Sequence, residues 1–154
     1  MYREILKKEF GIISINISDR RGIKKNPVQQ AYLKKNHGIC NDAHAGHPVK
    51  QVSLLAVEDI EEMKKKVRQL VPGDFAENIT TSKIDLASLP IGTLLALGEA
   101  RIEVSQIGKE CHDGCYIKQQ AGDCVMPRRG IFARVIKGGT ITTLSRGFVL
   151  SIPD

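Results

Sequence analysis

The sequence predicts a mainly β domain (β-rich α+β), a closed or nearly closed β-barrel of short strands with one main helix and small peripheral helices. Three observations predict it: polar and apolar residues alternate over short segments, glycines separate these segments, and only one long segment has helical spacing. A chain of 154 residues, 42% hydrophobic and 26% charged, can bury one sizeable core. We therefore expect a single domain over residues 1–154.

The first half of the chain contains the clearest strand and the main helix. Residues 13–18 alternate strictly between isoleucine and a small polar residue, which is typical of a strand with one face buried and the other wet. In residues 55–70 the apolar residues recur three or four positions apart, and Pro72 and Gly73 follow. This spacing predicts a helix over about 55–70, whose run Lys64–Lys66 forms a solvated face.

Two hairpins are expected in the second half of the chain. Residues 93–97 and 101–107 flank Gly98 and Glu99, and residues 131–136 and 140–144 flank Gly138 and Gly139. Strand-like segments separated by so short a glycine turn favour antiparallel pairing. Both hairpins would contribute to the barrel.

A net charge of +6 favours an anionic partner. The basic residues form separate short groups without interleaved aromatics that could stack on bases, so nucleic acid is not the expected partner and a phosphate-bearing small molecule suits the charge as well. No apolar run approaches the roughly 18 residues of a membrane span, and the first ten residues are too charged for a signal peptide. We expect a cytoplasmic protein with reduced cysteines.

Residues 37–47 gather three histidines, an aspartate and a cysteine. His44 and His47 are three residues apart, a spacing that could place two imidazoles on one zinc ion if the segment were helical. The glycines favour a loop, in which hydrogen-bonded histidines are the commoner arrangement. The next polar segment, residues 72–81, contains Asp74, Glu77 and Asn78, which could orient a substrate or cap the loop.

The richest segment extends from Gln106 to Gly130 and contains three of the four cysteines, Cys111, Cys115 and Cys124. A cysteine acts as nucleophile or soft-metal ligand only as thiolate, and neighbouring cations such as Lys109 or a protonated His112 favour that form. The spacing of Cys111 and Cys115 is not that of a zinc knuckle or a thioredoxin-like site. Arginines follow the cysteines, and their guanidinium groups could bind a phosphate or form surface ion pairs (Arg128, Arg129 and Arg134).

Together these segments resemble the MOSC family, named for the C-terminal domain of eukaryotic molybdenum cofactor sulfurase, and especially its small stand-alone prokaryotic members. Six stretches match in order, the last followed by residues 130–135: DAHAG (42–46), QVSLLA (51–56), PGDFAENIT (72–80), LPIG (89–92), QIGKEC (106–111) and GDCVMPR (122–128). The resemblance implies a β-rich barrel with a domain core at about 11–142. Ile107, Gly108 and Arg129 depart from the residues common in the family, so cofactor contacts are expected to differ.

The resemblance also implies site residues. It implies a cysteine that transfers sulfur or binds the molybdenum of the pterin cofactor, and Cys111 occupies that position, with Cys115 and Cys124 as second and third choices. The residues expected to bind the cofactor are Asp42, His44, Asn78, Lys109, Arg128 and Arg134. Arg128 and Arg134 would neutralise the pterin phosphate. The pyridoxal-phosphate domain of full-length sulfurases is not in this sequence, so we expect sulfur to come from a partner.

Three functions are compatible with this reading. The first is a molybdenum-cofactor-binding, sulfur-handling domain that acts through a cysteine thiolate, with a sulfur donor or a molybdoenzyme as its protein partner. The second is a molybdenum-dependent reductase of N-hydroxylated compounds, which would need a separate electron donor. The third is a non-catalytic partner protein in the biosynthesis or delivery of the cofactor.

Overall fold

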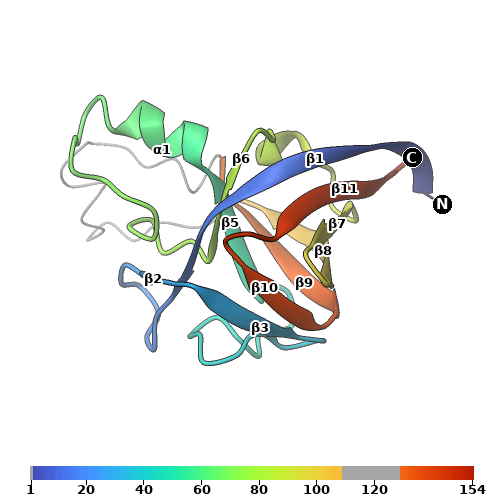
Figure 1. Ribbon diagram of the computed structural model, residues 1–154, viewed down its shortest axis with the longest axis horizontal. Helices are drawn as coiled ribbons and strands as arrows, with labels where there is room; N and C mark the ends of the chain where they lie inside the picture. The colour runs from blue at the N-terminus through green and yellow to red at the C-terminus, as the bar shows by residue number, and fades with distance from the viewer. Residues whose placement is uncertain (1, 109–128) are drawn as a thin grey trace.

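The computed structural model describes the backbone of residues 2–108 and 129–154, and the side chains of residues 8–108 and 129–154. In this part of the chain seven strands close into a mixed β-barrel (Figure 1). In their order round the wall they are β11 (Arg146–Pro153), β7 (Leu94–Leu97), β8 (Ala100–Ile107), β9 (Ile131–Lys137), β5 (Val52–Ala56), β6 (Ile79–Ser82) and β1 (Tyr2–Ile17). The pairing of β1 with β11 closes the ring, and β5 and β6 run parallel. The predicted fold class is confirmed.

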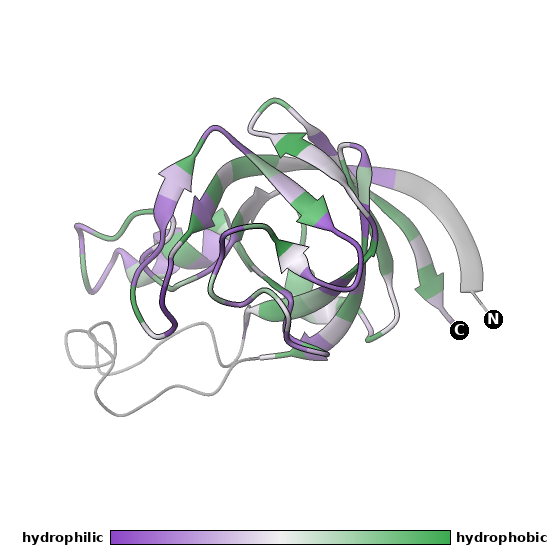
Figure 2. Ribbon diagram, turned by 90° about the horizontal axis from the view of Figure 1, so that it is seen from below, coloured by the Kyte–Doolittle hydropathy of each residue, from purple (hydrophilic) through white to green (hydrophobic). Residues whose placement is uncertain are grey.

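A second, three-stranded sheet lies against the barrel. Its order is β10 (Gly139–Thr142), β3 (Gln30–Lys34) and β4 (Gly38–Ile39), while the short β2 (Asn26–Val28) pairs with the end of β1. Figure 2 views the molecule from the side on which β2 and β3 lie and shows the strands arranged as a ring with hydrophilic loops around it. The loops before β2 and before β5, residues 18–25 and 40–51, hold five of the chain's 23 lysines and arginines.

Alternate residues of the barrel strands fill its interior. This inward set includes Leu54 and Ala56 of β5, Ile79 of β6, Ile102 and Val104 of β8, and Ile131, Ala133 and Val135 of β9. Phe132 and Leu55 are also buried, but they lie outside this core cluster, as expected for the opposite face of a pleated strand. Parts of the outer face of the barrel wall are therefore buried as well. There the wall positions side chains that do not belong to the core cluster.

The main helix is shorter than its sequence spacing predicts. α1 covers only Val57–Met63 and lies outside the barrel beside β5 and β6 (Figure 1). Leu55 and Ala56 belong to the fully buried strand β5, where they pair with Thr80 and Thr81 of β6. After Met63 the chain continues in turns, with Lys65 paired to Glu62 and 75% exposed, so the predicted solvated lysine face is present. A short 3-10 helix, η1 (Leu86–Ser88), is also present.

One predicted hairpin is confirmed and the other is wrong. β7 and β8 pair antiparallel around Gly98 and Glu99. β9 and β10 are consecutive, but β10 pairs with β3 in the second sheet. A Cβ at Gly139 would lie 2.8 Å from Glu99 Cβ and 3.0 Å from the nitrogen of Ala100. The glycine therefore lets the chain pass close to β8 and change sheets instead of turning back on β9.

The first strand is present, but its polar face is not wet. Ser14, Asn16 and Ser18 are all buried, whereas Ile13 is 46% exposed. The register of β1 against β6 shifts between Ile12 and Ser14, so the alternation is interrupted there. The polar residues of β1 instead enter a buried hydrogen-bond network on the outer face of the wall.

The ends of the chain lie side by side where β1 and β11 pair (Figure 1). β11 follows residue 142, the end of the predicted core, and is needed to close the barrel. None of the helices within the described ranges is long and apolar enough to cross a bilayer.

Candidate functional site

The candidate site lies on the outer face of the wall formed by β9, β5, β6 and β1. Phe132 of β9 is opposite Ser53 of β5, and Ser53 contacts Asn78, which precedes β6. Asn78 in turn contacts Asn16 of β1. Residues far apart in the sequence thus form one continuous polar layer, with Phe132 at one side of it.

Asn78 joins two strands through its side-chain amide. Its Oδ1 accepts hydrogen bonds from Ser53 N (3.0 Å) and Ser53 Oγ (3.2 Å), and its Nδ2 donates to the carbonyl oxygen of Asn16 (3.1 Å). Its side chain is fully buried. Both ends of the amide are therefore engaged by the barrel wall, a geometry that favours a structural role for Asn78 over direct contact with a ligand.

Glu77 organises the loop between Pro72 and Asn78. Its carboxylate accepts hydrogen bonds from Gly73 N (3.0 Å), Phe75 N (3.2 Å) and Thr80 Oγ1 (2.7 Å). Burial raises the pKa of this carboxyl above its ordinary value, although these hydrogen bonds oppose the rise. Of the two readings of this segment, the structure supports the one in which acidic residues cap the loop, since Asp74 likewise accepts from Val71 N.

Asp42 forms a buried ion pair with Lys25. Lys25 Nζ lies 2.8 Å from Asp42 Oδ1, and the two side chains are 1% and 0% exposed. Oδ1 also accepts from Ser18 N, and Oδ2 accepts from His44 N at 3.0 Å. Burial alone would raise the pKa of Asp42, but the hydrogen bonds and charge of Lys25, together with the two N–H groups, lower it below its ordinary value. Asp42 is therefore a carboxylate at neutral pH.

Phe132 packs against two polar side chains, one of which, His44, is a predicted site residue. The His44 ring meets it edge to face, with centroids 5.8 Å apart and an interplanar angle of 83°. Lys50 Nζ lies 5.8 Å from the ring centroid, within cation–π range. Arg134 is two residues further along the same face of β9 and pairs with Glu103 of β8 at 2.7 Å. We call these four residues, Phe132, His44, Lys50 and Arg134, the Phe132 cluster.

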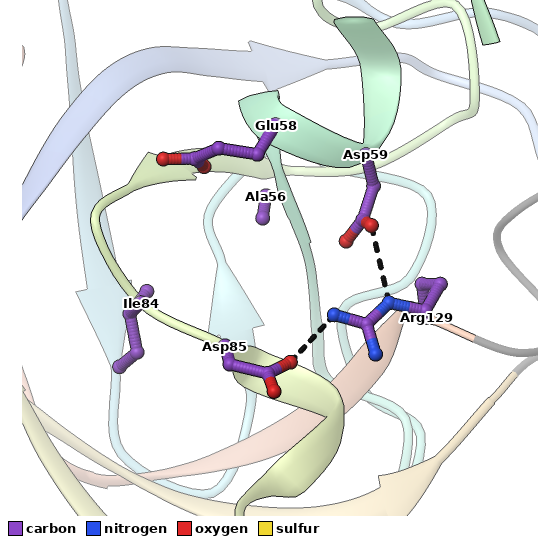
Figure 3. Close-up of a pocket in the computed structure, with 6 residues that line it drawn as sticks. All are labelled: Ala56, Glu58, Asp59, Ile84, Asp85 and Arg129. Atoms are coloured by element: carbon purple, nitrogen blue, oxygen red, sulfur yellow. Dashed lines mark hydrogen bonds and ion pairs between the residues drawn. The ribbon is translucent and has the colours of Figure 1, made fainter. Parts of the chain in front are cut away.

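The segment predicted to hold the cysteines starts and ends at the neighbouring edge of the wall. Gly108 N donates to Gly130 O at 2.7 Å, which holds together the two points where that segment leaves and rejoins the barrel. Arg129 then binds Asp59 at 3.1 Å and Asp85 at 2.5 Å, as Figure 3 shows. This arginine, expected either to bind phosphate or to form a surface ion pair, forms the ion pair.

Arg129 lines an open cavity of about 220 Å³. Its other lining residues are Ala56, Glu58, Asp59, Ile84 and Asp85 (Figure 3). Burial raises the pKa of Asp59 despite the nearby guanidinium. With three carboxylates around one arginine, this cavity is not suited to an anionic ligand.

The predicted site residues fall into three groups. His44 and Arg134 belong to the Phe132 cluster, and Asp42 binds the backbone of His44 beside it. Asn78 lies in the neighbouring polar layer. Within the described ranges no group of three or more histidine, cysteine or acidic side chains could hold a metal ion. His47, paired with His44 in the zinc interpretation, accepts at Nδ1 from the backbone of Val49 and Lys50. Outside the described residues lie Cys111, Cys115, Cys124, Lys109 and Arg128.

Sequence reasoning missed three residues of this site: Lys25, Lys50 and Phe132. In the sequence nothing local distinguishes Lys25 from its neighbour Lys24. Phe132 follows a glycine and an isoleucine in a predicted strand, where core packing is the ordinary expectation. The one available signal was the short distance in sequence from His44 and His47 to Lys50.

Comparisons with known proteins agree with this architecture. The family model of the MOSC domain matches residues 41–144. The YuaD protein from Bacillus subtilis superposes with a TM-score of 0.81 at 18% identity, over 98% of this chain and 99% of its own. YiiM from Geobacillus stearothermophilus superposes with a TM-score of 0.71 at 24% identity, over 92% and 74%. YiiM from Escherichia coli gives 0.67 at 17% identity, over 93% and 69%. At these identities the structural likenesses establish the fold, and no curated protein sequence gives a significant match.

Proposed function

The chain belongs to the MOSC domain family, and on this premise we propose that it binds the molybdenum cofactor and handles sulfur through a cysteine thiolate. The observation that supports this most is that Asp42 binds the backbone of His44, His44 packs on Phe132, and Arg134 follows Phe132 on the same face of β9. These residues are distant in sequence and belong to stretches that resemble the family. Phe132 also pairs with Gln106 near the ends of β9 and β8, the two strands that flank the predicted cysteine segment in the sequence.

The donors of the Phe132 cluster fit a planar, phosphate-bearing pterin. Lys50 and Arg134 supply positive charge, and the buried ring of Phe132 packs against His44 and Lys50 and so fixes their positions. Arg134 uses one terminal nitrogen for Glu103, while its Nε is buried and has no hydrogen-bond partner among the described residues. A buried donor of this kind is costly unless an acceptor is supplied, as a bound phosphate would do. The cofactor would bring molybdenum and its pterin sulfurs to this face.

The charge distribution supports an anionic ligand on the same side of the molecule. Residues 18–50 contain seven lysines and arginines against two aspartates, so this fifth of the chain has a net charge of +5, against +6 for the whole chain. Lys25 and Asp42 neutralise each other in the interior, and the remaining basic residues of this stretch are exposed or partly exposed. A surface of one sign attracts ligands of the opposite sign and speeds their association.

The sulfur chemistry is assigned by the resemblance to Cys111. The thiolate would attack the terminal sulfur of a protein persulfide, form a new sulfur–sulfur bond, and release the donor cysteine as its thiolate. Cys111 would then hold the sulfur as a persulfide, with no net oxidation or reduction. Lys109 and His112, as near neighbours in sequence, would favour the thiolate form. Lys109 and Arg128 would complete the contacts to the anionic cofactor.

The test is persulfide mapping by mass spectrometry on protein incubated with a cysteine desulfurase and free cysteine. We expect sulfur on Cys111, its loss in Cys111→Ser, and its retention in the matched control Cys40→Ser. Cys40 is partly buried directly after β4 and does not belong to the predicted segment. Sulfur found equally on all four cysteines, or only on Cys40, would refute the assignment, and sulfur on Cys115 or Cys124 alone would move the role to that residue.

A further inference from the structure

Lys50 reaches the Phe132 cluster from the end of a loop. β5 begins at Val52, and its pairing with β9 ends at Val52 and Ala133, so the backbone of Lys50 lies outside this ladder. A lysine side chain is a flexible four-carbon stem that carries a point charge. The position of Nζ, 5.8 Å from the ring centroid of Phe132, therefore depends on how firmly the backbone of Lys50 is held.

The residues on either side of this lysine are bound to the barrel. Ser105 Oγ of β8 donates to the carbonyl oxygen of Val49 (2.6 Å), and Val135 N of β9 donates to Gln51 Oε1 (3.0 Å). Val135 follows Arg134 in the sequence, so the second hydrogen bond ties the backbone next to one cation of the cluster to the backbone next to the other. The turn that leads into Val49 is the remaining part of this loop.

His47 closes that turn with its side chain. Its Nδ1 accepts hydrogen bonds from Val49 N at 3.0 Å and from Lys50 N at 2.9 Å. Pro48, the residue between, has no N–H and a fixed φ, so these two are the donors that the turn must satisfy. Asparagine and aspartate close turns in the same way, through a side-chain oxygen that accepts from the backbone N–H two residues further on.

The two hydrogen bonds also decide the tautomer of His47. A nitrogen that accepts from two N–H groups must carry a lone pair, and a neutral imidazole has one protonated nitrogen. Neutral His47 therefore carries its proton on Nε2. The side chain is partly buried, so Nδ1 is engaged inside the loop.

We propose that His47 is a positioning residue for Lys50: its Nδ1 holds the N–H groups of Val49 and Lys50 and thereby keeps Lys50 Nζ over Phe132. Resting on the proposed function, this makes His47 a determinant of how the protein binds the anionic group of the cofactor. His47 contributes through Lys50, without contacting the ligand.

In the competing explanation the Nε2–H of His47 contacts the ligand directly. Two substitutions separate the explanations. Asparagine places an acceptor where Nδ1 lies, so His47→Asn keeps the turn and removes the Nε2–H. Glutamine reaches the position of Nε2 with its amide, so His47→Gln keeps a donor there and removes the acceptor that closes the turn.

The first measurement is NMR on cofactor-free protein. Protons on the last carbons of Lys50 should resonate upfield, because they lie over an aromatic ring, and their signals are those missing in Lys50→Met. We expect this shift in the wild type and in His47→Asn, and the loss of at least half of it in His47→Gln. The matched control His37→Gln should retain it, since His37 contacts Lys34 and Gly46 through its backbone. Nitrogen-15 spectra of the wild type should show neutral His47 protonated on Nε2.

The second measurement is the molybdenum cofactor content of the same folded proteins. His47→Asn and His37→Gln should stay within twofold of the wild type, and His47→Gln should fall at least fivefold. If His47→Gln keeps the cofactor while His47→Asn loses it, His47 contacts the ligand directly and the proposal is wrong.

Two results without cofactor would also overturn the proposal. One is a neutral wild-type His47 protonated on Nδ1, which decides the matter even if His47→Gln fails to fold. The other is a folded His47→Gln that keeps the upfield shift of Lys50. If the NMR results are as expected while wild-type protein takes up no molybdenum cofactor, the positioning role of His47 stands and the proposed function fails.

Discussion

Replacing Asn78 by alanine tests whether this residue supports the wall or contacts the ligand. The substitution removes an amide whose oxygen serves the backbone of Ser53 and whose nitrogen serves the backbone of Asn16. These partner residues are fully buried, so water cannot take the place of the lost groups. Alanine leaves one backbone N–H and one backbone C=O without their side-chain partner.

The structure sets the size of the effect. An unsatisfied buried polar group costs about 1–3 kcal/mol, so two such groups should lower the free energy of unfolding by about 2–6 kcal/mol. This is a large fraction of the roughly 5–15 kcal/mol typical of a domain. With a urea dependence of about 1–3 kcal/mol per molar, the unfolding midpoint should fall by about 2 M.

Urea unfolding followed by circular dichroism measures this change. Asn26→Ala is the matched control, because Asn26 is exposed on the edge strand β2, and it should shift the free energy of unfolding by less than about 0.5 kcal/mol. If Asn78→Ala unfolds at the wild-type midpoint but loses molybdenum cofactor, the amide serves the ligand and the structural assignment of Asn78 is wrong.

Three further predictions concern the loop, the ion pair at the cavity and the barrel seam. Because burial raises the pKa of Glu77 above 4.5, its contribution to the free energy of unfolding is largest at low pH and is lost as pH rises through the raised value. We therefore expect the free energy of unfolding of the wild type minus that of Glu77→Gln to fall as pH rises. Urea titrations between pH 4 and 7 measure this difference, and a difference that increases with pH would contradict the prediction. Arg129→Gln should lower the free energy of unfolding by about 1 kcal/mol, less at high salt, and an effect independent of salt would argue against the ion pairs with Asp59 and Asp85. Gly147→Ala should cost about 1–3 kcal/mol, because its Cβ would lie 2.3 Å from the ring of Phe10, and Phe10→Leu should recover part of that loss in thermal melts.

Local pattern was sufficient for the architecture and for most strands. The alternation in residues 13–18 and the turn at Gly98 each predicted a strand or hairpin that exists. The local pattern was insufficient where a segment pairs with, or is buried by, a segment far away in the sequence. The polar face of β1 is buried because Asn78 lies 62 residues from Asn16, and the segment after Gly138 joins β3, more than a hundred residues earlier.

The residues of the candidate site likewise divide into those that the sequence could predict and those that it could not. Asp42, His44 and Arg134 could be predicted from stretches that resemble a family, and they lie together on one face of the wall. Lys25 could not, because its burial depends on the loop around Gly73 that packs on it and on the loop that carries Asp42. In sequence a buried lysine and its exposed neighbour Lys24 look alike.

The most direct test of the central claim is the molybdenum and pterin content of protein purified from a molybdenum-replete host that makes the cofactor. Wild-type protein should carry both in equal amounts, approaching one per chain. Lys50→Ala combined with Arg134→Ala should carry at most a tenth as much, while Lys65→Ala combined with Lys66→Ala, on the solvated turn after α1, should match the wild type. Wild-type protein without molybdenum and pterin, or a double variant in the Phe132 cluster that retains both, would contradict the account.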